Sequence, residues 1–148
     1  HLRILSGLYG VLKPLDRMQP YRLEMGTKFP IARKPNLVQF WKDRVTKHLN
    51  EEFANEEDPI LVNLASQEYF HAIDTKKLKA KIVNCSFKED RDGVLKIISF
   101  NAKKARGLMS RYIIQNRITN EDDLKGFDVE GYYYSEEHSD DNNLVFLR

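Results

Sequence analysis

Apolar positions recur at helical spacing in two segments of this 148-residue chain, residues 36–53 and 100–117. A repeat of three or four residues places the apolar side chains on one face of an α-helix and polar side chains on the other. Asn36 stands at the start of the first segment, where its side chain can cap the helix. The apolar positions of this segment are Leu37, Phe40, Trp41, Val45 and Leu49. Both segments are therefore predicted to form amphipathic helices.

Shorter apolar runs predict β-strands. The runs "ILVNL" at 60–64, "KIVNCSF" at 81–87 and "VLKIISF" at 94–100 have the length and composition of strands. Asp92-Gly93 separates the last two and is typical of a tight hairpin turn. Residues 130–147 show the same pattern of two strands around an acidic turn.

Short helices are expected after Ser66 and after Thr119 or Asn120, since these side chains can cap a helix. Helices and strands intermix without regular alternation. The sequence therefore predicts an α+β or irregular mixed α/β fold, in which a sheet is flanked by amphipathic helices. No repeat or linker divides residues 1–148, so a single domain is expected.

The glycine-containing stretch "LSGLYGVLKPLDRMQPYRLEMG", residues 5–26, predicts two short helices joined by a turn, because Pro14 and Pro20 interrupt the second. Gly7 and Gly10 allow two interpretations. They could provide the positive φ of a helix end. Alternatively, they could form a helix–hairpin–helix whose backbone N–H groups bind a DNA phosphate, although the usual motif has one residue between its glycines. Nearby cations that could reinforce such a contact are Lys13, Arg17 and Arg22.

Charge is strongly segregated behind a net charge of +2. Residues 1–50 contain ten Lys/Arg and three Asp/Glu, and residues 76–117 contain twelve Lys/Arg and three Asp/Glu. Residues 51–75 contain seven Asp/Glu and no Lys/Arg, and residues 118–148 contain nine Asp/Glu and two Lys/Arg. Such blocks form either solvated faces or a basic surface for a polyanion. One cysteine excludes an internal disulfide and fits a reducing compartment. Scattered histidines argue against a metal site, and no apolar run is long enough to span a membrane.

The second predicted helix, residues 100–117, has the most informative charge pattern. No Asp or Glu occurs between Lys96 and Arg117. Gly107 lies among the cations, where it lowers helix propensity and leaves room for a partner to approach. Ile114 falls on the same side, so the separation is imperfect. A face of unmixed cations is either an ordinary solvated surface or a site for nucleic-acid phosphate. The cations predicted to lie opposite the apolar face are Lys103, Lys104, Arg106, Arg111 and Arg117.

Four blocks, "LRILSGLYGVLKPLDRMQPYRLEMG", "NLASQEYF", "KIISFNAKKARGLMSRYIIQNR" and "FDVEGYYY", resemble the bacterial YaaA family of peroxide stress proteins. The resemblance implies a C-terminal part of a longer protein, whose N-terminal portion carries a "SPAK"-like segment. The lack of a starting methionine agrees with this expectation. The resemblance further implies a role under hydrogen peroxide stress, lowered free iron, and DNA binding in a positively charged cleft of a mixed α/β fold with a helix–hairpin–helix.

The leading hypothesis is therefore a cytoplasmic protein that binds duplex or branched DNA mainly through backbone phosphates, with weak sequence preference and without a cofactor or metal. No sequence pattern indicates the oligomeric state. The residues expected to contact DNA are Gly7, Gly10, Lys13, Arg17, Arg22, Lys103, Lys104, Arg106 and Arg111.

Two other functions are compatible with the sequence. An enzyme acting on a nucleotide or on damaged DNA could use polar residues near turns, including Lys103 for Schiff-base chemistry, although no catalytic constellation is recognisable. The other candidates for this role are Asp16, Glu24, Ser66 and Glu68. Direct iron binding has one conceivable site, formed by His138 with Glu136, Glu137, Asp140 and Asp141. An indirect effect on iron is the preferred interpretation.

Overall fold

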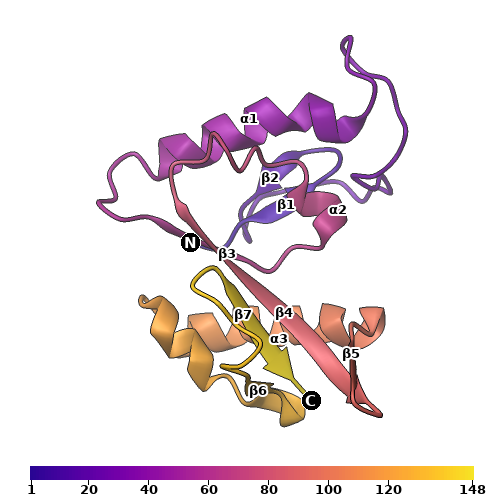
Figure 1. Cartoon of the computed structure of the whole chain (residues 1–148). Coiled ribbons are helices and arrows are strands. Elements are labelled where there is room, and N and C mark those ends of the chain that lie inside the picture. The colour runs from indigo at the N-terminus through magenta and orange to yellow at the C-terminus, as the bar shows by residue number, and fades with distance from the viewer. The chain divides into compact units, whose positions relative to one another are not determined.

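A computed structural model describes residues 1–148 and divides them into two interleaved units. Unit 1 consists of His1–Pro59 and Ala65–Ala80, and unit 2 of Ile60–Leu64 and Lys81–Arg148 (Figure 1). The chain therefore passes from one unit to the other three times. The expectation of a single domain stays a prediction.

Unit 1 contains a β-hairpin, a long helix and a short helix. Its elements are β1 (Ile4–Ser6), β2 (Gly10–Leu12), α1 (Leu37–Glu52) and α2 (Gln67–Phe70). The capping prediction for α1 is confirmed, because the Asn36 side chain accepts a hydrogen bond of 2.9 Å from the backbone N–H of Gln39. The core of this unit includes a cluster of buried Met25, Leu37 and Ala72 with half-buried Trp41 beside them.

The helix–hairpin–helix predicted near the N-terminus is wrong, because residues 4–12 form an antiparallel β-hairpin. Ser6 lies opposite Gly10 in the register, and Gly10 has a φ of 77°, the left-handed conformation that completes a three-residue turn. β-Branched residues in both strands favour the extended conformation. No helix forms directly after β2, since Pro14 and Pro20 each remove a backbone donor.

Unit 2 is built on a mixed sheet. Its strands are β3 (Ile60–Asn63), β4 (Lys81–Arg91), β5 (Val94–Lys96), β6 (Tyr133–Tyr134) and β7 (Asn143–Leu147). The order across the sheet is β3-β4-β7-β6, with β5 paired to the far end of β4. β3, β4 and β7 run parallel to one another, whereas β6 is antiparallel to β7. The predicted turn between β4 and β5 is confirmed, because Asp92 and Gly93 both have positive φ.

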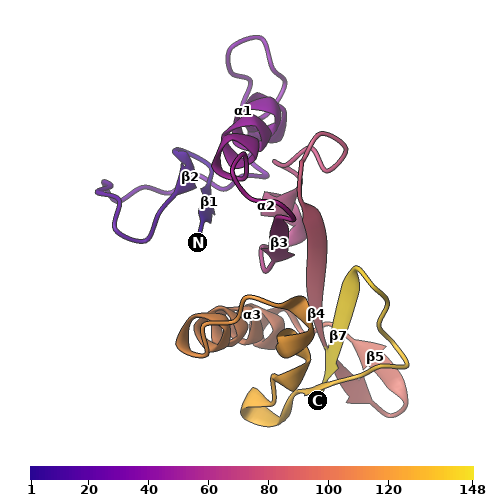
Figure 2. The same ribbon diagram turned by 90° about the vertical axis from the view of Figure 1, so that its left-hand side faces the viewer.

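One face of this sheet is covered by α3 (Ser99–Gln115), which the pattern of residues 100–117 predicted within two residues. Figure 2 shows α3 on one side of β4 and β7, with no helix of unit 2 on their other side. Ala102, Ala105 and Met109 of α3 are buried against alternate residues of β4. Two short 3-10 helices, η1 (Glu121–Gly126) and η2 (Val129–Gly131), follow α3. The predicted α+β class is therefore confirmed.

Aromatic side chains fill the core of unit 2. The rings of Phe87 and Phe146 are stacked with centroids 5.3 Å apart. Phe127 meets both rings edge-on, at 5.8 and 5.7 Å. Each such pair adds about 0.5–1.5 kcal/mol beyond the burial of its area. This core fixes the side of α3 that faces the sheet, and therefore also the side that faces solvent.

Candidate nucleic-acid interface

The solvent side of α3 carries the predicted cations. We define the basic face of α3 as Lys103, Lys104, Gly107 and Arg111, which are all exposed. Lys103 and Arg111 make no ion pair or side-chain hydrogen bond, so their charges are uncompensated by the protein. A methyl group added at Gly107 would meet nothing within 4 Å. The backbone between the cations is therefore open to an approaching molecule.

Two large apolar side chains lie on the same side of the helix, Ile114 as expected and Phe100 in addition. Phe100 is 76% exposed and Ile114 is 57% exposed. At 100° per residue, both project within about 20° of Gly107. The helical angle alone could have identified Phe100, but this residue was predicted to end a strand as well as to begin the helix. An exposed aromatic ring among cations can stack on a nucleic-acid base.

Lys104 is the one cation of the basic face with an acidic partner. Its ammonium group lies 2.5 Å from the carboxylate of Glu130. Glu130 belongs to η2 and has a φ of 56°. Both side chains are substantially exposed, so this ion pair is weak and would exchange readily for a phosphate contact.

Arg106 is placed differently from the prediction, which put it opposite the apolar face. It is half-buried, and its guanidinium donates hydrogen bonds of 3.3 Å to the carbonyls of Leu64 and Ala102. The reason is its position only about 40° round the helix from Ala102, which faces the sheet. Burial lowers the pKa of Arg106. Its contact with DNA stays a prediction.

Arg117 lies beyond the end of α3, although the pattern placed it on the helix. It occupies the left-handed position that follows the cap, with a φ of 51°. The N–H of Arg117 bonds to the carbonyl of Ile114, and that of Ile118 bonds to the carbonyl of Ile113. These are the two hydrogen bonds of a Schellman motif, in which glycine is the usual residue at the position of Arg117.

The candidates of the N-terminal segment belong to unit 1, not to the unit that contains α3. Gly7 and Gly10 are both buried. A methyl group at Gly7 would lie 2.3 Å from the Leu23 carbonyl oxygen, and one at Gly10 would lie 2.6 Å from the Trp41 ring. The Trp41 indole also donates a hydrogen bond of 2.8 Å to the Gly7 carbonyl. Close packing therefore explains both glycines, and a phosphate contact there stays a prediction.

The cations after the hairpin differ in their surroundings. Lys13 lies 3.6 Å from Glu52, which also forms a 2.7 Å ion pair with Arg3. Hydrogen bonding to Arg3 holds the pKa of Glu52 below its usual range. Arg17 and Arg22 are exposed and have no ion pair. They are therefore the cations of this segment most available to a polyanion.

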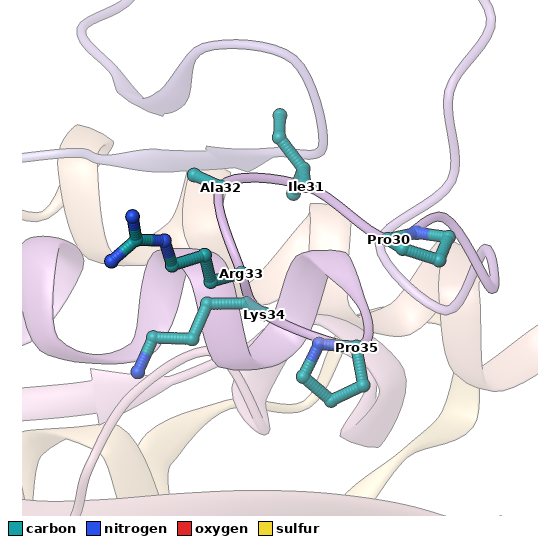
Figure 3. A pocket seen from close by; sticks show the side chains of 6 residues that line it. All are labelled: Pro30, Ile31, Ala32, Arg33, Lys34 and Pro35. Atoms are coloured by element: carbon teal, nitrogen blue, oxygen red, sulfur yellow. The ribbon is translucent and has the colours of Figure 1, made fainter.

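Unit 1 also presents a tight turn, shown in Figure 3. Ile31 and Lys34 exchange two backbone hydrogen bonds, of 2.9 and 2.8 Å, around Ala32 and Arg33. Both central residues have positive φ, which is unusual without glycine. Figure 3 shows the Arg33 and Lys34 side chains extending to the same side of the turn. The turn borders a shallow hollow of about 410 Å³ lined by Pro30–Pro35, and no acidic residue lines this hollow.

The residues considered for catalysis do not form one group. Glu24 and Glu68 are linked through neighbouring residues: the Tyr69 hydroxyl donates to Glu24 at 2.9 Å, and the Gly26 N–H donates to Glu68 at 2.7 Å. Burial and these carboxylates raise the pKa of Tyr69 to about 12, so it stays protonated at neutral pH. Lys103 belongs to unit 2 and the others to unit 1. The enzymatic alternative stays a prediction.

A buried carboxylate connects α3 with the sheet. Glu89 of β4 accepts hydrogen bonds from Asn101 at 2.5 Å, Arg91 at 2.7 Å and Arg148 at 2.6 Å. The hydrogen bond from Asn101 contributes most to lowering the pKa of Glu89, and the bonds from Arg91 and Arg148 lower it further. All of its partners belong to unit 2, so this cluster fixes the start of α3 relative to β4 and β7.

No group of three or more His, Cys, Asp or Glu residues is arranged to hold a metal ion. His138, considered above for iron, is hydrogen-bonded through Nδ1 to the Ser135 hydroxyl at 2.8 Å. Asp140 accepts hydrogen bonds from its neighbours Asn142 and Asn143. As for membranes, none of the helices has the length and apolar character required for a transmembrane span.

Cys85 is buried in the core of unit 2. Burial raises the pKa of its thiol to about 12. At pH 7 the thiol is then almost entirely protonated, and the thiolate is the form that reacts with peroxide. We expect Cys85 to be unreactive toward hydrogen peroxide and toward 5,5′-dithiobis(2-nitrobenzoate) in the native protein, and to react with the latter within minutes in about 6 M guanidinium chloride. A rapid reaction of Cys85 with either reagent in the native protein would show that the core around this thiol opens to solvent.

The comparisons with known proteins agree on one family. A family model described as "Peroxide stress protein YaaA" matches residues 1–138. A UPF0246 protein from Paracidovorax citrulli (strain AAC00-1) is 54% identical over 148 residues, which is 100% of this chain and 57% of that protein. The chain thus spans less than two thirds of the length of this curated relative.

Proposed function

The chain belongs to the YaaA family of peroxide stress proteins, and on this premise we propose that it binds DNA through backbone phosphates at the basic face of α3. The family places the protein in the response to peroxide, whereas the DNA contact is our proposal. The observation that carries it is the uncompensated charge of Lys103 and Arg111 on either side of open backbone at Gly107. A polyanion would neutralise these cations.

Phosphate contacts alone give little sequence preference, because every nucleotide presents the same phosphate. Phe100 adds a second kind of contact, stacking on a base that is unpaired or at a junction. The proposed partner is therefore DNA of any sequence, with a preference for branched over continuous duplex structures. Arg17 and Arg22 of unit 1 are proposed as additional phosphate contacts.

This binding would also limit iron-dependent damage. Cations that condense on DNA are released when Lys and Arg neutralise the phosphates. Fe²⁺ held at those phosphates would be released with them, so that its reaction with peroxide takes place away from the DNA. The proposed effect on iron is therefore indirect and needs no metal site in the protein.

The test is a titration of the full-length protein against a labelled duplex and a four-way junction at several salt concentrations. Six phosphate contacts would give a slope of about −5 in the logarithm of the association constant against that of salt concentration. We expect a slope between about −3 and −6 and tighter binding to the junction. A slope near zero would refute phosphate binding.

Two positions near the basic face carry residues that reduce stability. Glycine within a helix costs about 1 kcal/mol relative to alanine, and Gly107 has space for a side chain. Arg117 has positive φ, which costs a non-glycine residue about 1–2 kcal/mol. Both residues are exposed and oppose folding in the region of α3, which supports a binding role there.

Substitutions at these two positions are expected to raise the stability of the protein and to weaken its binding to DNA. Gly107→Ala and Arg117→Gly should each raise the free energy of unfolding by about 0.5–1 kcal/mol. Each should also weaken DNA binding, the first by blocking close approach and the second by removing a charge. Thermal unfolding and DNA titration of the full-length variants would measure both effects. A stabilised variant with unchanged affinity would remove that position from the interface.

A further inference from the structure

The strand β3 lies at the edge of the unit 2 sheet. It is the last strand in the order β3-β4-β7-β6 and pairs only with β4. Its residues Ile60, Leu61 and Val62 are all half-buried. Edge strands usually carry charges, prolines or bulges that prevent pairing with another chain. The run Ile60–Val62 has none of these.

The amino-acid pattern of β3 is that of an interior strand. Strands with one solvated face alternate apolar and polar residues, whereas strands buried on both faces are continuously apolar. Ile60 and Val62 pack against the core beneath α3. Leu61 alternates with these residues and points to the opposite face of the sheet, where it is only half-buried. All-parallel sheets are almost always covered on both faces, and three of the four strands in this order, β3, β4 and β7, run parallel to one another.

We propose that β3 is an interior strand of the full-length protein, and that its outer edge pairs with a strand from the part of the protein outside these 148 residues. The curated relative provides the necessary length, because the chain covers 57% of it. About two fifths of that relative therefore lies outside the matched region. The added strand would cover backbone groups along Ile60–Val62, and its adjoining segment would cover Leu61.

Amide hydrogen exchange of the full-length protein tests this pairing directly. Successive backbone N–H groups of a strand point to opposite sides. Of the adjacent amides of Leu61 and Val62, β4 can therefore protect only one. We expect both amides in the full-length protein to exchange within about tenfold of the rates of Val83 and Asn84, which lie in the interior strand β4. If one of the two exchanges more than about 100-fold faster than its neighbour, the proposal is overturned.

Two further measurements distinguish a strand of the same chain from a second copy of the protein and from an open edge. Protection that disappears on dilution would assign the edge to a second copy and overturn the proposal. Leu61→Pro and Val62→Pro each remove one N–H, so both should lower the melting temperature of the full-length protein by similar amounts. Full tolerance of one of the two would show an open edge. Neither measurement depends on DNA binding, so its outcome is independent of the proposed function.

Discussion

A full-length protein that carries Lys103→Glu and Arg111→Glu is expected to bind duplex DNA at least about 100-fold more weakly than the wild type at about 0.1 M salt. Each replaced cation loses a charge-assisted contact worth about 1.5–3 kcal/mol, and tenfold in affinity corresponds to about 1.4 kcal/mol. Both side chains are exposed and unpaired in the protein. Their replacement should therefore leave the melting temperature almost unchanged, so that the loss of affinity reports the interface alone.

The salt dependence gives this prediction a second readout. Each lost phosphate contact lowers the magnitude of the logarithmic salt slope by about 0.9, so the double variant should lower it by about 1.8. The matched control is Lys76→Glu with Lys79→Glu, which changes net charge equally at two exposed lysines of unit 1. An equal loss in the control would indicate a general effect of net charge, and would contradict a site on α3.

The same pair of variants tests the effect on iron. If the protein displaces Fe²⁺ from phosphates, the wild type and the control should protect plasmid DNA from strand breaks by Fe²⁺ and hydrogen peroxide. The α3 variant should lose this protection in parallel with its affinity. Protection that survives the loss of DNA binding would indicate a separate mechanism.

Gly7→Ala should be the most destabilising single substitution in the N-terminal hairpin, lowering the free energy of unfolding by roughly 2–3 kcal/mol. The added methyl group would lie 2.3 Å from the Leu23 carbonyl oxygen. This contact is with backbone, so no side-chain rotation can relieve it, and the hairpin must move away from the segment around Leu23. That movement would also disturb the hydrogen bond from Trp41 to the Gly7 carbonyl.

The control for this prediction is Leu8→Ala, one residue further along the same turn. Leu8 is 46% exposed, so its truncation should change stability by about 0.5 kcal/mol or less. Thermal and denaturant unfolding of both variants would measure the difference. If Gly7→Ala left stability unchanged but weakened DNA binding, the glycine would serve phosphate binding instead of packing.

The helices and strands with strong periodicity could be predicted from the sequence. The Asn36 cap of α1, the Asp92-Gly93 turn and the period of α3 depend on neighbouring residues, so local patterns are sufficient for them. The hairpin β1–β2 was missed because its glycines indicate a turn without specifying what the turn joins. Its identity depends on contacts with Leu23 and Trp41, which are distant in the chain.

The candidate site shows the same division. Its charge could be predicted because the sequence contains no acidic residue over a long cationic segment. The helical angle between Arg106 and Ala102 is enough to indicate that Arg106 is half-buried. Its hydrogen bond to the Leu64 carbonyl and the position of Arg117 could not be predicted, since they depend on the packing of β3 and on the residue where α3 ends. Lys104 and Glu130 are far apart in the sequence, and no local pattern connects them.

The interleaving of the two units has a consequence for synthesis on the ribosome. β3 leaves the exit tunnel before Ala65–Ala80, the segment that completes unit 1, and its partner β4 follows only after that segment. The nascent chain must therefore hold the β4-facing edge of an apolar strand unpaired while another unit is still being completed. A chaperone that binds short apolar segments would find its target at Ile60–Val62, and a pause in translation near residue 80 would prolong that exposure.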